Sequence, residues 1–140
     1  MNNGLTSRAV ILPLLACSLL LLGACAATIP KAVSIEERAL ARWEALFAGD
    51  FAAAYAYLSP GYRSSLTVAQ YELSVLQNRI RWVSAKYIKS ECTETSCNVK
   101  INIGYTATNV LPGVDVFRSA VDIEEAWLRL DGQWYLVPGH

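Results

Sequence analysis

The chain has 140 residues, of which 54% are hydrophobic and 17% are charged, and its 12 basic residues balance its 12 acidic residues. The charges are interspersed and form no basic face, so we expect no nucleic-acid partner. Residues 25–140 suffice for one domain, which at this size buries roughly two thirds of the surface that the unfolded chain exposes.

The N-terminus carries a targeting segment. Residues 9–22 form an apolar run that follows Arg8 and ends before the small residues Gly23 and Ala24. A membrane-spanning helix needs about 20 apolar residues, so this shorter run favours a processed signal peptide over a transmembrane anchor.

The end of this run, Leu22-Gly23-Ala24-Cys25, resembles the lipobox of bacterial lipoproteins. The resemblance implies that residues 1–24 are removed and that Cys25 becomes the N-terminus and carries lipid, including palmitate. Two alternatives stay open: ordinary signal-peptidase cleavage after Ala26, and an uncleaved anchor. Cys17 follows a second lipobox-like stretch, but its apolar core would be short, so Cys25 is preferred.

Residues 25–33 are predicted to form the lipidated cysteine and a short tether. Eight extended residues reach roughly 28 Å at ~3.5 Å each, so we expect the domain to sit close to the membrane that holds the anchor. Position 26 is alanine and not aspartate. In a Gram-negative cell envelope, the lipoprotein resemblance then implies the outer membrane, facing the periplasm.

Residues 34–140 are predicted to form a single domain that opens with helices. Ser34-Ile35-Glu36-Glu37 has the capping-box pattern, and apolar residues at helical spacing continue it to about residue 48. Gly49 is a C-terminal stop, and Asp50 can cap a second helix that runs to Leu58 and ends at Ser59-Pro60-Gly61. Thr67 is expected to cap a third helix over residues 67–77.

Strands are predicted from Ile80 onward, where the apolar period becomes two. The first two strands form a hairpin, with loose alternation in residues 80–88 and clean alternation from Val99 to Tyr105. We expect a loop at residues 109–115, a long strand at 116–130, a tight turn at Asp131-Gly132 and a last strand at 133–137. Helices followed by antiparallel strands indicate the α+β class.

This order resembles the nuclear transport factor 2-like superfamily. The resemblance rests on residues 43–63, including Ser59-Pro60-Gly61-Tyr62-Arg63, and on Trp127 with Asp131-Gly132-Gln133-Trp134-Tyr135. It implies N-terminal helices packed on a curved four-stranded antiparallel sheet that forms a cone.

Cys92 and Cys97 bracket four residues at the tip of the predicted hairpin. Equal strand arms place them opposite each other, so in an oxidising compartment we predict a structural disulfide. The spacing is not Cys-x-x-Cys and no histidine is near, which leaves a redox pair or a metal site without support.

The sequence offers few side chains for a catalytic site. The single histidine, His140, is the last residue of the chain, so the fold offers no histidine for a catalytic triad or dyad. We predict no cofactor and no metal. Asp122 and Glu124 share one face of a strand and are candidates for an acidic base within the cone, although a solvated strand face is the usual explanation of such a pair.

Large aromatic side chains are candidates for lining a pocket. Core packing is the more frequent reason for such residues. With the two carboxylates, the predicted pocket comprises Trp43, Phe47, Tyr55, Trp82, Tyr87, Asp122, Glu124 and Trp127.

Three functions remain open at this point. The first, which we favour, is a non-catalytic envelope lipoprotein that binds another envelope protein or itself. The second is a carrier for a small apolar ligand held in the cone. The third is an isomerase-like or hydratase-like enzyme, which requires a buried Asp122 or Glu124 with a raised pKa.

Overall fold

The computed structural model describes residues 33–78 and 80–139. The predicted signal segment, Cys17, Cys25, all of the tether but its last residue, and His140 lie outside these ranges. The elements are α1 (Ile35–Ala48), α2 (Phe51–Ala56), α3 (Pro60–Arg63), α4 (Val68–Leu76), β1 (Ile80–Cys92), β2 (Ser96–Leu111), β3 (Val114–Leu130) and β4 (Gln133–Val137). No helix in the described part is long and apolar enough to cross a membrane.

The predicted caps of the first two helices are confirmed. Ser34 Oγ accepts a hydrogen bond from the Glu37 amide, and the Ser34 amide donates to Glu37 Oε2, which completes the capping box of α1. Gly49 ends α1 at φ 72°, a conformation that glycine adopts without strain. Asp50 then accepts the Ala53 amide and starts α2.

The chain between α2 and α4 differs from the expectation. The second helix ends at Ala56 and not at Leu58. Ser59 caps an additional short helix, α3, with Pro60 in its first turn. Leu58 is fully buried and forms an isolated bridge with Leu136 of β4, so contact with the sheet ends α2 early.

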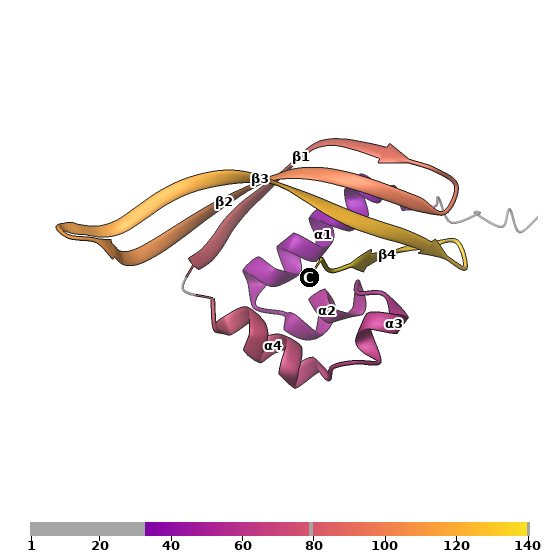
Figure 1. Cartoon of the computed structure of the whole chain (residues 1–140), viewed down its shortest axis with the longest axis horizontal. Coiled ribbons are helices and arrows are strands. Elements are labelled where there is room, and N and C mark those ends of the chain that lie inside the picture. The colour runs from indigo at the N-terminus through magenta and orange to yellow at the C-terminus, as the bar shows by residue number, and fades with distance from the viewer. Residues whose placement is uncertain (1–32, 79, 140) are drawn as a thin grey trace, which may run out of the picture. The chain divides into compact units, whose positions relative to one another are not determined.

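The four strands form one antiparallel sheet in the order β1-β2-β3-β4. The predicted loop at residues 109–115 is wrong, because β2 runs to Leu111 and β3 begins at Val114. Pro112 and Gly113 alone make the turn, with Gly113 at φ 75°. The β2–β3 hairpin therefore extends past the helices as a long arm (Figure 1).

Two register shifts in β1, between Trp82 and Ser84 and between Tyr87 and Lys89, explain its loose apolar alternation. At the first shift, Ser84 lies opposite Gly104 of β2. A Cβ on Gly104 would collide with Ser84 Oγ, so glycine leaves room for the Ser84 hydroxyl between the two strands.

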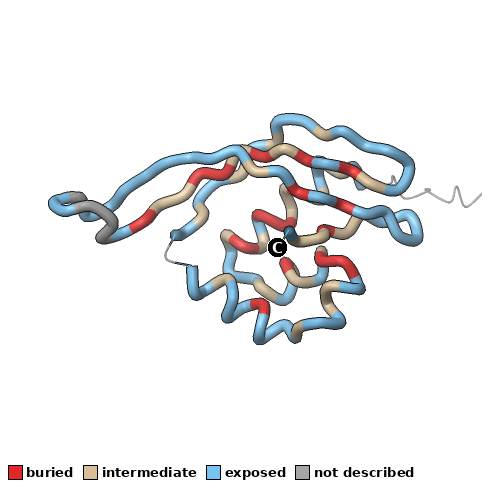
Figure 2. Tube along the Cα trace, viewed as in Figure 1, coloured by how far each residue is buried: buried red, intermediate tan, exposed pale blue. Residues whose placement is uncertain are grey.

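The helices all lie on one side of the curved sheet (Figure 1), and α1 contacts β1 and β2 directly. The α+β expectation of helices on a four-stranded antiparallel sheet is therefore confirmed. Buried residues gather between α1 and the centre of the sheet (Figure 2). The largest fully buried side chains are Leu58, Cys97, Val99, Ile101, Ile103 and Trp127.

Candidate functional site

Glu125 of β3 is the centre of a buried polar cluster between the sheet and α1. Its Oε1 accepts hydrogen bonds from Arg42 Nη1 at 3.0 Å and from Trp43 Nε1 at 2.9 Å. Its Oε2 accepts one from Trp127 Nε1 at 3.1 Å. Both carboxylate oxygens are thus engaged by side chains of the domain itself.

The charge state of Glu125 reflects two opposing influences. Burial raises the pKa of its carboxyl, and the Arg42 guanidinium and the two indole N–H groups act in the opposite direction. Glu125 is only 7% exposed, so desolvation outweighs the ion pair. Because Arg42 and Trp43 of α1 both donate to it, this carboxyl serves to join α1 to β3.

Asp122 and Glu124 do not lie where the predicted pocket requires them. Both are exposed on the outer face of the sheet, opposite the helices. Asp122 accepts a hydrogen bond from Asn102 Nδ2 at 2.8 Å and pairs with Lys100 at 3.3 Å. These contacts lower the pKa of the Asp122 carboxyl. The requirement for a buried carboxyl is met by neither residue.

An apolar hollow of about 390 Å³ opens on the inner face of the sheet beside α1. Of the predicted pocket residues, Trp43 and Trp82 line it, and their rings meet edge-on at 5.4 Å. The rest of the lining comes from the three long strands: Ile80, Ile103, Tyr105, Val121 and Ile123. This size falls in the range of small-molecule pockets, roughly 300–1,000 Å³.

The remaining aromatic candidates serve other purposes. Phe47 lines a second hollow of about 420 Å³, together with Trp82 and residues of α1, α2 and α4. The single hydroxyl proton of Tyr55 is shared between the carbonyls of Arg63 and Leu66, both within 2.9 Å of the hydroxyl oxygen, and this contact holds the chain between α3 and α4. Trp127 is buried against Glu125, and the Tyr87 hydroxyl bonds Ser90 on the same strand.

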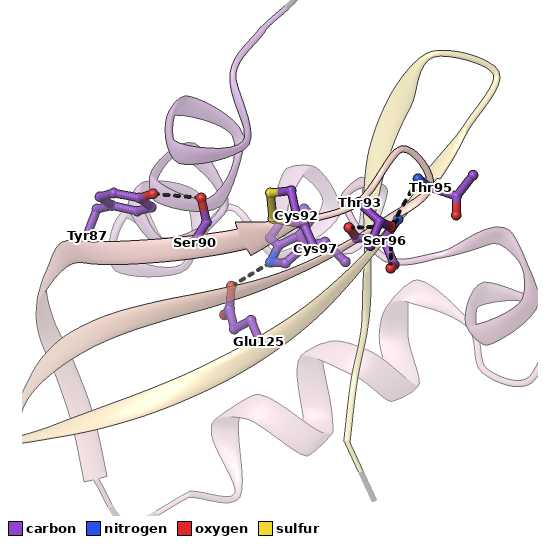
Figure 3. Close-up of a disulfide and its surroundings, with 9 residues drawn as sticks. Tyr87, Ser90, Cys92, Thr93, Thr95, Ser96, Cys97 and Glu125 are labelled. Atoms are coloured by element: carbon purple, nitrogen blue, oxygen red, sulfur yellow. Dashed lines mark hydrogen bonds between the residues drawn. A yellow bond between two sulfur atoms is a disulfide. The ribbon is translucent and has the colours of Figure 1, made fainter.

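Cys92 and Cys97 are paired in register at the tip of the β1–β2 hairpin, with Cα atoms 4.0 Å apart, and form a disulfide (Figure 3). The prediction of a bonded pair is confirmed. Thr93 and Ser96 close the tip through hydrogen bonds between their backbones and hydroxyls. Cys97 is buried and Cys92 is exposed, so the bridge ties an outer strand to the core.

Metal-ligand side chains do not gather elsewhere in the described ranges: no three His, Cys, Asp or Glu residues there are placed to hold an ion. At the inner face, the described residues offer apolar contacts around the hollow and one carboxyl, that of Glu125, which is hydrogen-bonded within the domain.

The sequence reasoning missed Glu125 although the signal for it was present. Glu125 and Trp127 lie two residues apart on one strand and so share a face. A tryptophan of a helix-covered sheet is expected inside, which would have placed Glu125 inside with it.

Comparison with known proteins supports the fold class. No protein-family model matches the sequence, and no curated protein matches it. Among solved structures, a SEC-C motif containing protein from Rhodopseudomonas palustris aligns with a TM-score of 0.61 at 14% identity, covering 78% of this chain and 79% of that one.

Two further structures share the fold. A Campylobacter jejuni protein named as an NTF2-like transpeptidase aligns with a TM-score of 0.54 at 11% identity, over 76% of this chain and all of that one. A sec-c motif containing protein from Psychrobacter arcticus aligns with a TM-score of 0.56 at 11% identity. The alignment covers 76% of this chain and 60% of that chain. At these identities the likeness concerns the fold alone, and it agrees with the expected nuclear transport factor 2-like architecture.

Proposed function

We propose that this chain is a lipid-anchored protein of the bacterial cell envelope whose domain is a non-catalytic binding or assembly module. The observation that carries the proposal is the engagement of Glu125. It is the one buried carboxylate of the described residues, and Arg42, Trp43 and Trp127 use both of its oxygens. A general acid or base must reach a substrate proton, and this carboxyl faces its own domain.

The anchor is supported by the Leu22-Gly23-Ala24-Cys25 motif and by the disulfide, since disulfides persist in oxidising compartments. Two or three acyl chains on Cys25 would hold the protein firmly, because each buried methylene contributes roughly 0.8 kcal/mol. The test is metabolic labelling with palmitate in the native host. Label is expected in the Cys17→Ser protein and absent from the Cys25→Ser protein, and label in the latter would refute the assignment.

The binding role is tested by native mass spectrometry of the protein purified from the envelope of its own host. A stoichiometric protein partner, or a second copy of the chain, supports an assembly module. A domain that carries neither, but retains a small molecule that denaturation releases, favours a carrier.

A carrier of small apolar molecules is the second candidate, and the 390 Å³ hollow is the observation that favours it. Ile80 lines the hollow and is partly exposed, so Ile80→Gln should weaken retention of a bound apolar molecule without preventing folding. Val83 lies on the same strand, is exposed and lines neither hollow, which makes Val83→Gln the matched control. Equal retention by the two variants would exclude the hollow as the site.

A further inference from the structure

Part of β3 lies at an open edge of the sheet. β4 pairs with β3 only from Ala126 to Leu130, so the preceding residues of β3 pair with β2 on one side. Within the described residues, no strand pairs with the other side of residues 116–124. Residues 115–122 and 124 are all exposed, and this run follows the outer border of the arm (Figure 2).

The register tells which backbone groups face this open edge. The Arg129 amide donates to the Thr95 carbonyl, so the backbone of Arg129 points toward the β2 side. The β2–β3 register has no shift between Leu128 and Val116, so backbone directions alternate regularly along this stretch. The even-numbered residues 116–124 therefore direct their N–H and C=O groups to the open edge. Natural edge strands are protected by proline, a bulge or charged side chains; this stretch has no proline and no bulge, and its charged residues, Arg118, Asp122 and Glu124, are of both signs.

The stretch is complementary to itself when two copies run antiparallel with Ala120 opposite Ala120. On the outer face, Arg118 of each copy then lies opposite Asp122 of the other. On the inner face, Phe117 of each copy lies opposite Ile123 of the other. Even-numbered residues meet even-numbered residues, so all the open backbone groups find partners. Opposite charges and apolar pairs directly across a ladder are both stabilising.

Neighbouring two-fold registers are less favourable. Centring the pair on residue 118 or 122 places Arg118 opposite Arg118 or Asp122 opposite Asp122, and like charges across a ladder are destabilising. Centring it on Ser119 leaves Arg118 opposite Ala120 and Asp122 opposite Val116, so no charges pair. Centring it on Val121 places Arg118 opposite Glu124, but it also places Phe117 opposite the buried polar Glu125. The register about Ala120 is the one that combines opposite charges with the apolar pair of Phe117 and Ile123.

The same stretch exposes apolar side chains that a second copy would cover. Phe117 is 36% exposed and Val121 is 47% exposed, and Val121 also lines the 390 Å³ hollow. Arg118 forms no ion pair with any other described residue, which leaves it available to the second copy.

We propose that the protein forms a symmetric dimer in which the β3 strands of two copies pair antiparallel about Ala120, producing one continuous eight-stranded sheet. Each copy occupies the open edge of the other, so the interface is isologous and closed. The inference deepens the proposed binding role, because a second copy of the chain is one of the partners that this role allows. The strand pairing itself requires no lipid anchor and no other partner, so failure of the cross-link would overturn the dimer and leave the palmitate test of the anchor unaffected.

The test is site-directed cross-linking of the full chain in the envelope of its host. Opposed residues of a hydrogen-bonded pair have Cα atoms about 5.5 Å apart, so an Ala120→Cys variant should give a covalent dimer with a short bifunctional thiol reagent. Ala126→Cys is the matched control, since Ala126 is also an exposed outer-face alanine of β3 but its edge is occupied by β4. Ala126→Cys and the unsubstituted protein should stay monomeric on a denaturing gel.

Charge exchange checks the register. Added to Ala120→Cys, Arg118→Asp should weaken association about tenfold, because it replaces two symmetry-related attractions by repulsions. Asp122→Arg in the same chain should restore the dimer. Restoration by Glu124→Arg instead would overturn the register about Ala120. Monomer only, or a cross-link to a different protein, would overturn the dimer itself.

Discussion

Arg42 and Glu125 are both nearly buried, and removing one of them leaves the other without its partner. We expect Glu125→Leu to lower the free energy of unfolding by about 3–5 kcal/mol, the usual cost of breaking a buried ion pair from one side. The double variant Arg42→Met, Glu125→Leu should be less destabilised than Glu125→Leu alone, because it leaves no unpaired charge buried at this position. Urea denaturation measures both, and a double variant no more stable than Glu125→Leu would contradict the interpretation.

The raised pKa of Glu125 makes its contribution to stability pH-dependent. The folded protein holds this proton more tightly than the unfolded chain does, so the contribution is full below the ordinary carboxyl pKa of about 4.3. It is lost as the pH rises through the raised pKa of the folded state.

This effect can be isolated with a variant that cannot titrate at position 125. The difference in unfolding free energy between the unsubstituted protein and Glu125→Gln should therefore shrink as the pH rises from 4 toward neutrality. Urea denaturation at a series of pH values measures this difference. A difference that grows over this range would mean that Arg42, and not burial, controls the carboxyl.

At the scale of single elements, the disulfide stabilises the β1–β2 hairpin. Closing a six-residue ring is worth about 2 kcal/mol on the chain-entropy estimate. We expect Cys92→Ser with Cys97→Ala to lower the free energy of unfolding by about this amount; alanine at 97 avoids burying a hydroxyl. A reductant should destabilise the unsubstituted protein similarly and leave the variant unchanged. Sensitivity of the variant to reductant would contradict this account.

The capping box of α1 offers a second test at this scale. Ser34→Ala removes the acceptor of the Glu37 amide and should cost about 1 kcal/mol of stability. Ser64 is a suitable control, since its exposed hydroxyl bonds only the Gly61 carbonyl at the end of a four-residue helix. Thermal unfolding of both alanine variants measures the difference in stability. An equal loss of stability in the two variants would contradict a specific contribution of the Ser34 cap.

The elements that the sequence predicted correctly depend on local chemistry. Ser34, Gly49 and Asp50 act on their own helix ends, and Asp131-Gly132 makes its turn from two residues with positive φ. The errors arose where a distant partner decides. The predicted loop at residues 109–115 is mostly strand because β2 and β3 pair almost to their turn, and α2 ends early because Leu58 meets Leu136.

The site was less predictable than the fold for the same reason. Trp43 and Trp82 were expected in a pocket and do line the hollow, but the rest of its lining required strand register. Asp122 and Glu124 were considered because they are acidic, and the structure places them on the outer face of β3, opposite the face that carries Trp127.

For the whole molecule, the junction at Glu125 joins residues that are far apart in the chain. Arg42 and Glu125 are 83 residues apart, whereas the β1–β2 and β2–β3 hairpins close over short turns. Closing a long loop costs more chain entropy than closing a short one, so contacts of high sequence separation tend to form late. We therefore expect the hairpins to assemble before α1 is fixed to β3.

This order of assembly can be measured by stopped-flow kinetics in urea. Glu125→Leu should mainly accelerate unfolding and leave the folding rate nearly unchanged, because its contacts are absent from the transition state. If Glu125→Leu instead chiefly lowered the folding rate, the contacts of Glu125 with α1 would belong to the folding nucleus. α1 precedes all four strands in the chain and is therefore synthesised before them, yet we expect it to be fixed to β3 only after the hairpins have formed.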